Sequence, residues 1–568
     1  MESSLALVDE TAAGTRAAVT DQPRRWRPGR GTWNLAVVGG CVALFALLAW
    51  NSRWIADDGL IVLRTVRHLL EGHGPVFNVG ERVEVNTSPL WTYLLALVGM
   101  SGLRLEWLSL AVGGLCAVAG LGLALDGTRR LHGTTVVLAP AGVLAVLAMS
   151  PFREFATSGL ETGLAFCWLG AVWWLLVRLA RDDGGRHWPT ALVIGLGPLV
   201  RPEFALFTAA GFVALLVVTR ARRGPALRLA LVAGALPVAY QVFRMGYYGL
   251  LTPNTALAKE ASTPRIDRGW RYLTDTVDTY LLLVPLLALA VALVVTVRRR
   301  TVAGLGVAVL APVLVLTLYV VWIGGDFMHA RMLLPAIFCL LLPVLVLPAT
   351  PRALLPLGVV GAWTVAAGWW LHVPYSPQEP AGIGISDERA FWAYSTRQEH
   401  PVLAEHFAEV PMMSAPLDTL HAQDGPVIVA HGETGWQAHP TTLSHSTVVT
   451  CCIGAVGMLT DSDVRVHDSL ALANPLASHA EPRPQGMAGH DKHLPPAWDL
   501  ADAGTPGAGL ADARAALACP EVRDVLASVR EPMSLERFWD NLTGAFHRTG
   551  LRYDPDPAVA KTCGAAVG

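Results

Sequence analysis

Long apolar runs alternate with short polar connections through the first two thirds of the chain and are absent from the last third. The first run, Trp33–Trp50, holds 18 residues without a charge, close to the roughly 20 that a helix needs to cross a hydrocarbon core. A shorter run at 89–101 is expected to be half-buried or re-entrant. The pattern predicts eleven membrane-spanning helices, at 33–50, 103–125, 136–150, 160–178, 189–200, 203–219, 226–247, 280–297, 302–323, 333–350 and 353–372.

Arginine clusters fall in alternate connections between these runs. Positive residues favour the cytoplasmic side of a membrane, so the eleven crossings place the N-terminus inside and the C-terminus outside. The runs 189–200 and 203–219 are separated by a polar break at Arg201-Pro202-Glu203, which is tolerated only where it lines protein or water. The clusters are Arg24, Arg25, Arg27 and Arg30; Arg129 and Arg130; Arg178, Arg181 and Arg186; Arg220, Arg222, Arg223 and Arg228; and Arg298, Arg299 and Arg300.

Composition and charge support a division into two parts. The chain of 568 residues is 53% hydrophobic and 15% charged, against roughly 45–50% and about 25% in soluble domains. These values exclude an ordinary soluble enzyme and a disordered protein, and the net charge of −2 excludes a nucleic-acid binder. Residues 1–372 carry a net charge of +10 and residues 373–568 a net charge of −12. We expect a cytoplasmic tail at 1–32, a membrane domain at 33–372 and an extracytoplasmic soluble domain at 373–568.

Polar clusters that are not arginine groups all fall on the predicted outer face. Charges at membrane depth are expensive and usually mark a functional site. Carboxylates and cations on one face suit a substrate with a membrane-anchored phosphate and a polar acceptor that arrives from outside. The clusters are Asp57-Asp58, 158–162, 201–203, 253–259 and 324–331.

Asp57 and Asp58 directly follow the first predicted span. Leu60, Leu63 and Val66 recur at helical spacing, so one of the two acids has a structural explanation as the N-cap of a helix. Two acids are more than a cap needs, and a carboxylate beside the bilayer can take a proton from an incoming hydroxyl. Neighbouring residues on a helix point about 100° apart, so we expect the two acids to have different roles.

The other candidate residues each have a plain structural alternative. Lys259 is the only lysine among residues 1–372 and can hold a phosphate as a point charge, or it is a solvated loop residue. Arg201 can bind phosphate or pair with Glu203, and His329 can bind phosphate or cap a helix. Further candidate phosphate ligands are Arg331 and Arg64, and the candidate substrate ligands are Glu161, Glu203, Asp326, Asn86, Glu84 and Asn254, of which Asn86 and Glu84 are also explained as turn residues.

Motifs of several other enzyme classes are missing from the sequence. It contains no P-loop, no dinucleotide fingerprint, no zinc-binding helix motif and no nucleophile elbow. No acidic cluster has a clear metal-ligand spacing. We therefore expect no required cofactor, with a divalent cation as an option.

The chain resembles the GT-C superfamily of membrane glycosyltransferases, which use polyprenyl-phosphate sugars outside the cytoplasm. The segments that carry this resemblance are Asp57-Asp58, 158–162, 201–203 and 324–331. Within this superfamily, the chain is similar to the terminal β-(1→2)-arabinofuranosyltransferase family. The segments that carry this narrower resemblance are 54–67, 74–78, 80–84, 247–251, 468–477 and 489–492.

The resemblance implies a GT-C fold and decaprenyl-phosphoryl-arabinofuranose as the donor. It implies the non-reducing end of an arabinan, on arabinogalactan or lipoarabinomannan, as the acceptor. An acid in the first external loop is the usual catalytic base of such enzymes. Family members tend to use the first acid, so Asp57 is expected as the base and Asp58 as the cap of the helix.

Three other functions remain as alternatives. A transporter or flippase for a lipid-linked sugar would need polar groups through the membrane depth, whereas the polar groups here cluster on one side and no internal repeat is found. A non-catalytic assembly factor with the same fold is the second alternative, and the paired acids argue against it. The third is a GT-C enzyme that uses another polyprenyl-phosphate sugar.

The last third of the chain is expected to be an α/β or β-rich module that binds glycan. Short apolar runs predict strands at 427–430 and 447–451, and the segment 512–518 is expected to be helical. Disulfides persist outside the cytoplasm, so four cysteines of this part are expected to form two bonds, with no bond between the two neighbours. These cysteines are Cys451, Cys452, Cys519 and Cys563.

Overall fold

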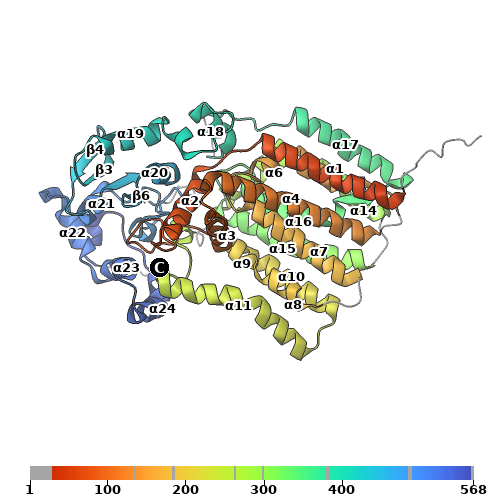
Figure 1. The fold of residues 1–568 in the computed structure, drawn as a ribbon, viewed down its shortest axis with the longest axis horizontal. Coiled ribbons are helices and arrows are strands. Elements are labelled where there is room, and N and C mark those ends of the chain that lie inside the picture. Colours follow the sequence, from red (N-terminus) through yellow and green to blue (C-terminus); the bar gives the residue numbers. More distant parts are fainter. Residues whose placement is uncertain are drawn as a thin grey trace, which may run out of the picture.

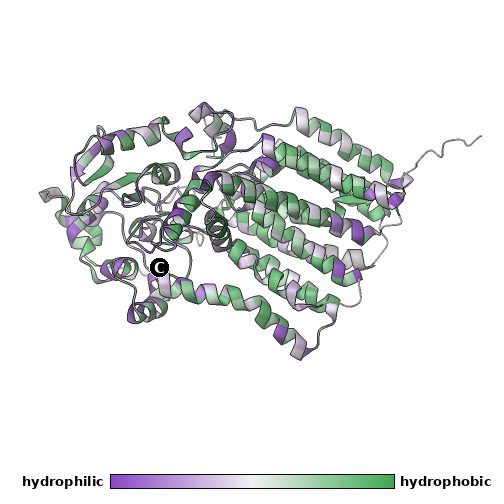
Figure 2. Cartoon of the chain, in the orientation of Figure 1, coloured by the Kyte–Doolittle hydropathy of each residue, from purple (hydrophilic) through white to green (hydrophobic). Residues whose placement is uncertain are grey.

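The computed structural model describes residues 29–133, 136–181, 186–260, 264–296, 300–378, 384–483 and 489–563. Figure 1 shows a bundle of long helices beside a smaller domain that combines helices with a sheet. The bundle helices are apolar along most of their length (Figure 2), as expected for a membrane domain. Most of the predicted cytoplasmic tail, and Arg298 and Arg299, lie outside the described residues.

Five helices of the described part are long and apolar enough to cross a membrane, and one bent pair raises the number to six. The predicted count of eleven spans is therefore not confirmed. The pair consists of α13 (Ile266–Thr279) and α14 (Leu283–Thr296), which meet at 72°. The five helices are α1 (Arg30–Asn51), α4 (Leu105–His132), α7 (Thr162–Arg181), η1 and α10 together (Pro202–Thr219), and α11 (Arg223–Tyr248).

Several predicted spans are shorter helices or are broken. The segment 136–150 becomes a strand and two short helices, and 333–350 becomes short helices and a strand, because prolines interrupt both. The two strands pair with each other, which satisfies backbone groups that lipid would leave unpaired. These elements are β1 (Leu138–Pro140), α5 (Gly142–Ala148), α6 (Ser150–Glu154), η2 (Arg331–Leu333), α16 (Leu334–Leu341), η3 (Leu342–Val344) and β2 (Val346–Pro348).

The predicted break near residue 201 is present. Helix α8 (Trp188–Gly195) is followed by α9 (Gly197–Val200), which ends at Arg201, where the backbone is extended. After it, η1 (Pro202–Phe204) leads into α10 (Ala205–Thr219). The remaining helices of the bundle are α3 (Pro89–Gly99), α15 (Arg300–Ile323), η4 (Pro351–Ala353) and α17 (Leu354–Trp369).

Helices α4 and α7 pack with their backbones in close contact. A Cβ atom on Gly170 would meet the carbonyl oxygen of Gly120, and one on Gly163 would meet that of Gly113. Small residues that allow this approach are typical of helix pairs in membranes, where packing replaces the hydrophobic effect.

The C-terminal domain is built on a four-stranded sheet with the order β4-β3-β5-β6. The strands are β3 (Val427–Gly432), β4 (Gly435–Pro440), β5 (Thr447–Thr450) and β6 (Arg465–Asp468). Strand β4 pairs antiparallel with β3, whereas β3, β5 and β6 run parallel. The predicted strands at 427–430 and 447–451 are confirmed, and the domain is of the α/β kind.

Helices surround this sheet and reach the bundle. The predicted helix at 512–518 is confirmed as α22 (Ala511–Leu517). The others are α18 (Glu388–Thr396), η5 (Ala404–Phe407), α19 (Pro411–His421), α20 (Ile453–Leu459), η6 (Ala477–His479), α21 (Pro496–Asp502), η7 (Ala508–Leu510), α23 (Pro520–Arg530), α24 (Leu535–Gly550) and α25 (Pro557–Ala560).

The cysteine prediction is wrong in part. Cys519 and Cys563 form a disulfide, because α22, α23 and the end of the chain meet in one small apolar core. Cys451 and Cys452 are free thiols whose sulfur atoms lie 3.4 Å apart. They directly precede α20, and the bond between Cys519 and Cys563 leaves them no distant cysteine of this domain to pair with.

Candidate active site

The site lies where helix α2 (Asp57–Leu70) enters the junction between the bundle and the C-terminal domain (Figure 1). Helix α2 presents an apolar face to α20, and Leu60, Ile61 and Leu63 are buried. Its N-cap position is Ala56, which offers no side-chain hydrogen bond. The prediction that Asp58 is the cap of this helix is therefore wrong, because the helix already begins at Asp57.

Asp57 faces the C-terminal domain. Its carboxylate accepts hydrogen bonds from the backbone N–H groups of Gly454 at 3.2 Å and Ala455 at 2.7 Å. These groups belong to the first turn of α20, where free N–H groups attract a negative charge. Burial raises the pKa of Asp57 to about 7, although the two backbone hydrogen bonds oppose the shift. Asp57 therefore caps a helix of the other domain.

Asp58 points to a different partner. Its Oδ2 lies 3.5 Å from Nη1 of Arg331, and its side chain keeps 28% of its surface exposed. Arg331 also binds Asp326, with 2.6 Å between Nε and Oδ2. Asp326 accepts a further hydrogen bond from the backbone N–H of Phe327. A buried arginine thus joins the first-loop acid to the acid of the 324–331 segment.

The 324–331 segment is held by helix α13. Gly324 and Gly325 adopt left-handed backbone angles of +90° and +70°, which glycine reaches without strain. Arg268 donates to the carbonyl oxygen of Gly324 and, at 3.0 Å, to that of Asp326. Tyr272 donates its hydroxyl hydrogen to the carbonyl oxygen of Met328 at 2.9 Å. The segment is therefore fixed before any substrate arrives.

Glu161, Arg201 and Glu203 form a second ionic group. Arg201 donates to Glu161 at 2.6 Å and to Glu203 at 2.5 Å. Arg201 therefore pairs with Glu203, which was the alternative to phosphate binding, and it has Glu161 as an additional partner. The charge of Glu161 also acts on Arg331, so this group adjoins the Asp58–Arg331–Asp326 cluster.

Lys259 and His329 differ in their surroundings. Lys259 follows α12 (Asn254–Ala258) and is half-buried, and its ammonium group has no ion pair among the described residues. Burial raises the pKa of Asp326. The positive charges of Arg331 and, more weakly, Lys259 outweigh this effect and hold the pKa below its usual value. His329 is buried, and its Nδ1 lies 2.7 Å from Oδ2 of Asp275. Lys259 therefore supplies an unpaired cation, whereas His329 is already occupied at one nitrogen.

Three other candidates make structural contacts, and a fourth, Asn86, is buried beside one of them. Arg64 is fully buried and donates to the carbonyl oxygens of Phe77, Gly457 and Val464, so the prediction that it binds phosphate is wrong. Glu84 binds Arg244 and Tyr240 of α11, and Asn86 lies in the same buried wall. Asn254 donates to the carbonyl oxygens of Ala471 and Leu472. None of these four lies in the ionic cluster around Arg331.

Glu388 was not found from the sequence. It is buried at the start of α18 and accepts hydrogen bonds from Trp392 at 2.7 Å and Ser386 at 3.3 Å. Burial, followed by the charge of Asp58, raises the pKa of Glu388 to about 8. A neutral carboxyl group therefore stands beside Asp58. The pair Asp387-Glu388 looks like an ordinary helix start, and Asp387 does cap α18, so no local signal marks Glu388.

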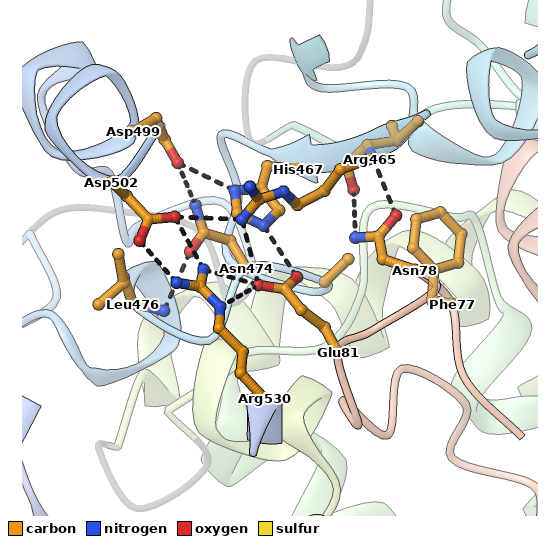
Figure 3. A network of polar contacts seen from close by, with 12 residues as sticks. Phe77, Asn78, Glu81, Arg465, His467, Asn474, Leu476, Asp499, Asp502 and Arg530 are labelled. Carbon is orange, nitrogen blue, oxygen red and sulfur yellow. Dashed lines mark hydrogen bonds and ion pairs between the residues drawn. The ribbon is translucent and has the colours of Figure 1, made fainter. Parts of the chain in front are cut away.

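A buried ionic network fastens the first loop to the C-terminal domain (Figure 3). Glu81 lies 3.0 Å from Nε2 of His467 and 2.7 Å from Arg530. Nδ1 of His467 lies 3.0 Å from Asp499. Burial lowers the pKa of His467, but the carboxylates of Glu81 and Asp499 outweigh this effect and raise the pKa to about 9. The network also contains Arg465, Asp502, Asn78 and Asn474.

The site thus combines the partly exposed carboxylate of Asp58 with two cations, Arg331 and Lys259. Such a set can take a proton from a hydroxyl and meet the charge of a departing phosphate. Within the described ranges, no group of three or more His, Cys, Asp or Glu side chains is arranged to hold a metal ion.

Comparisons with known proteins cover most of the chain. A family model described as the AftB family C-terminal domain matches residues 428–561. A terminal β-(1→2)-arabinofuranosyltransferase of Mycobacterium tuberculosis is 39% identical, over 92% of this chain and 95% of the relative. A terminal β-(1→2)-arabinofuranosyltransferase of Corynebacterium glutamicum is 37% identical, over 90% of this chain and 84% of the relative. No solved structure matches the chain.

Proposed function

Because the chain belongs to the family of terminal β-(1→2)-arabinofuranosyltransferases, we propose that it transfers arabinofuranose to the terminal 2-hydroxyl of arabinan chains. The acceptors would be the arabinan of arabinogalactan or lipoarabinomannan. The similarity to both relatives spans the bundle and the C-terminal domain, and this breadth is the observation that carries the proposal.

The proposed donor is decaprenyl-phosphoryl-arabinofuranose. A lipid phosphate needs a site beside apolar helices with cations that are not neutralised. Lys259 has no ion pair among the described residues and is the cation available to a phosphate. Arg331 is paired with Asp326 at 2.6 Å and lies 3.5 Å from the partly exposed Asp58. The bundle helices around them suit a polyprenyl chain. The reaction as proposed requires no cofactor, because these cations meet the charge of the leaving phosphate.

We assign the catalytic base to Asp58 in this proposal, in place of the first acid of the pair. A base must be within reach of the hydroxyl it deprotonates, and Asp58 keeps part of its surface exposed. It would take the proton of the acceptor 2-hydroxyl while the bond from that oxygen to the anomeric carbon forms and the bond to the phosphate breaks. Glu388 lies buried beside it, and Asp58 is the acid that faces Arg331.

Asp57 would act as a positioning residue. Both of its oxygens are occupied by backbone N–H groups of α20. Its contribution would be to fix the C-terminal domain over the first loop, so that Asp58 on the next position of α2 faces the substrate.

The proposed setting is the plasma membrane. The bundle would have the GT-C architecture with eleven spans, and the active site and C-terminal domain would lie outside the cytoplasm. The described arginines at the C-terminal ends of α4, α7 and α10, at the end of the bundle away from the C-terminal domain (Figure 1), support this orientation.

The proposal is tested by transfer with the purified full-length protein. The lipid donor and a short arabinan are the substrates, and uridine diphosphate arabinofuranose is the control donor. We expect a new terminal β-(1→2) linkage, seen by nuclear magnetic resonance of the product, with the lipid donor only. Equal transfer from the nucleotide sugar, or a different linkage, would contradict the proposal.

A further inference from the structure

The carboxyl ends of the three parallel strands open into a cavity of about 260 Å³. His431 follows the buried part of β3, Cys451 follows β5 and Ser469 follows β6, and all three line the cavity. In open α/β sheets, ligands bind in the crevice outside the carboxyl ends of the strands. The position and size of the cavity therefore indicate a site for a small molecule or a short piece of a polymer.

The lining of the cavity combines the aromatic ring of Trp436 with two kinds of polar group. The uncharged ones come from Thr450, Ser469 and Asn474, and the carboxylates from Asp468 and Asp499. Trp436 is half-buried on strand β4 and meets the ring of His431 edge to face, with centroids 5.4 Å apart. Thr450 is 2% exposed, and its hydroxyl has no hydrogen-bond partner among the described residues. An aromatic face that covers the apolar side of a ring, beside hydroxyls that bond its polar edge, is a suitable surface for a sugar.

The charges around the cavity exclude a phosphate. Asp468 and Asp499 line it, and no lysine or arginine does. Asp468 is held in place by the backbone N–H groups of Ala473 at 2.8 Å and Asn474 at 3.2 Å. An anionic donor would be repelled here, whereas a neutral chain of sugars would not. The cavity therefore suits the acceptor and not the lipid phosphate.

The cavity is also coupled to the first-loop acids. Cys451 is separated by Cys452 and Ile453 from the N–H groups that bind Asp57. On another side, Asp499 of the cavity wall contacts His467, which contacts Glu81 of the first loop (Figure 3). A chain seated in the cavity would thus be held at a fixed place relative to α2.

We propose that this cavity binds arabinofuranose units of the acceptor chain behind the reacting end, an inference that rests on the proposed function. It would raise the affinity for long acceptors and align their ends toward Asp58. Trp436 and Thr450 would be binding residues that take no part in the chemical step.

The first test compares acceptors of two lengths with Trp436→Ala and Thr450→Val in the full-length protein. Trp539 of α24 is 60% exposed and does not line the cavity, so Trp539→Ala is the matched control. We expect Trp436→Ala to raise the KM of a hexasaccharide acceptor about tenfold, as for an aromatic anchor, and Thr450→Val to raise it less. The KM values of a disaccharide acceptor and of the lipid donor should not change. An unchanged hexasaccharide KM, or an equal loss with both acceptors, would overturn the inference.

A second test separates this inference from the proposed function. Binding of the arabinan hexasaccharide is measured by saturation-transfer nuclear magnetic resonance without any donor, so transfer is not needed. Binding that Trp436→Ala removes and Trp539→Ala keeps would support the cavity even if no transfer were seen. Transfer that proceeds normally without such binding would overturn the cavity while the proposed function stands. Preferential binding of arabinose 5-phosphate would also overturn it.

Discussion

The carboxylate of Asp57 accepts a hydrogen bond of 2.7 Å from the backbone N–H of Ala455, although the two residues are 398 positions apart. The first residue of α2 therefore caps α20 in the C-terminal domain. This contact leaves the neighbouring Asp58 to face Arg331. Two adjacent acids thus have different partners, and each partner suggests a different role.

Lys259 should be required for efficient use of the lipid donor. Lys259→Ala removes a cation that has no ion pair in the described chain, and loss of a charge-assisted contact costs about 1.5–3 kcal/mol. We expect at least a tenfold loss in kcat/KM for the lipid donor and an unchanged KM for the acceptor. Lys561 pairs with Asp512 on the surface of the C-terminal domain, so Lys561→Ala is the control. Equal kcat/KM values of the two variants for the lipid donor would show that Lys259 is a solvated loop residue and does not bind the donor.

The buried network around Glu81 should make stability depend on pH. The pKa of His467 is raised from 6.5 to about 9 in the folded protein, so its contribution is fully present below pH 6.5. The contribution falls as the pH rises through the folded pKa and is lost above it, for a total of about 3 kcal/mol. The melting temperature of the wild type should therefore fall between pH 6.5 and 9.5 more steeply than that of His467→Gln. Parallel curves would show that the imidazolium does not stabilise the fold.

The four cysteines of the C-terminal domain should behave as one disulfide and two thiols. The Cys519–Cys563 bond closes a loop of 44 residues, and such a crosslink stabilises by roughly 4 kcal/mol. Cys519→Ser together with Cys563→Ser should lower the melting temperature. Cys451 and Cys452 should react with an alkylating reagent in the native protein, as detected by peptide mass spectrometry. A Cys451 or Cys452 peptide linked to either distant cysteine would contradict the pairing.

The proposed orientation can be measured by labelling single cysteines. A cysteine at Arg299 should react with a membrane-impermeant reagent only from the cytoplasmic side. A cysteine at Arg483, which is exposed in the C-terminal domain, should react only from the other side. Labelling of both positions from one side would reverse the assignment of the active site to the outer face.

The sequence pattern predicts where helices lie, but it does not predict every place where a helix is broken into shorter pieces. Apolar runs mark α1, α4 and α11 because burial in lipid demands uninterrupted apolar residues. They do not show that β1 and β2 pair, since that contact joins segments about 200 residues apart in the chain. Backbone pairing across such a distance leaves no local trace.

The same limit applies to the candidate site. The paired acids of the first loop and the 324–331 segment could be predicted, because charges between apolar runs are unusual. Arg64 could not be told apart from a phosphate ligand, because its partners Gly457 and Val464 lie in the C-terminal domain. Glu388 was missed for a related reason, since only its position beside Asp58 distinguishes it.

The central claim is that Asp58 is the base and Asp57 is a positioning residue. The most direct measurement is the turnover of Asp58→Asn and Asp57→Asn with the lipid donor and a short arabinan, together with the melting temperature of each variant. Loss of a general base lowers the rate by about 10²–10⁴-fold, so Asp58→Asn should lose activity by this factor while it melts near the wild-type temperature. Asp57→Asn should melt lower and keep measurable turnover. A nearly normal rate for Asp58→Asn, with Asp57→Asn inactive but fully folded, would contradict the account and return the base to Asp57.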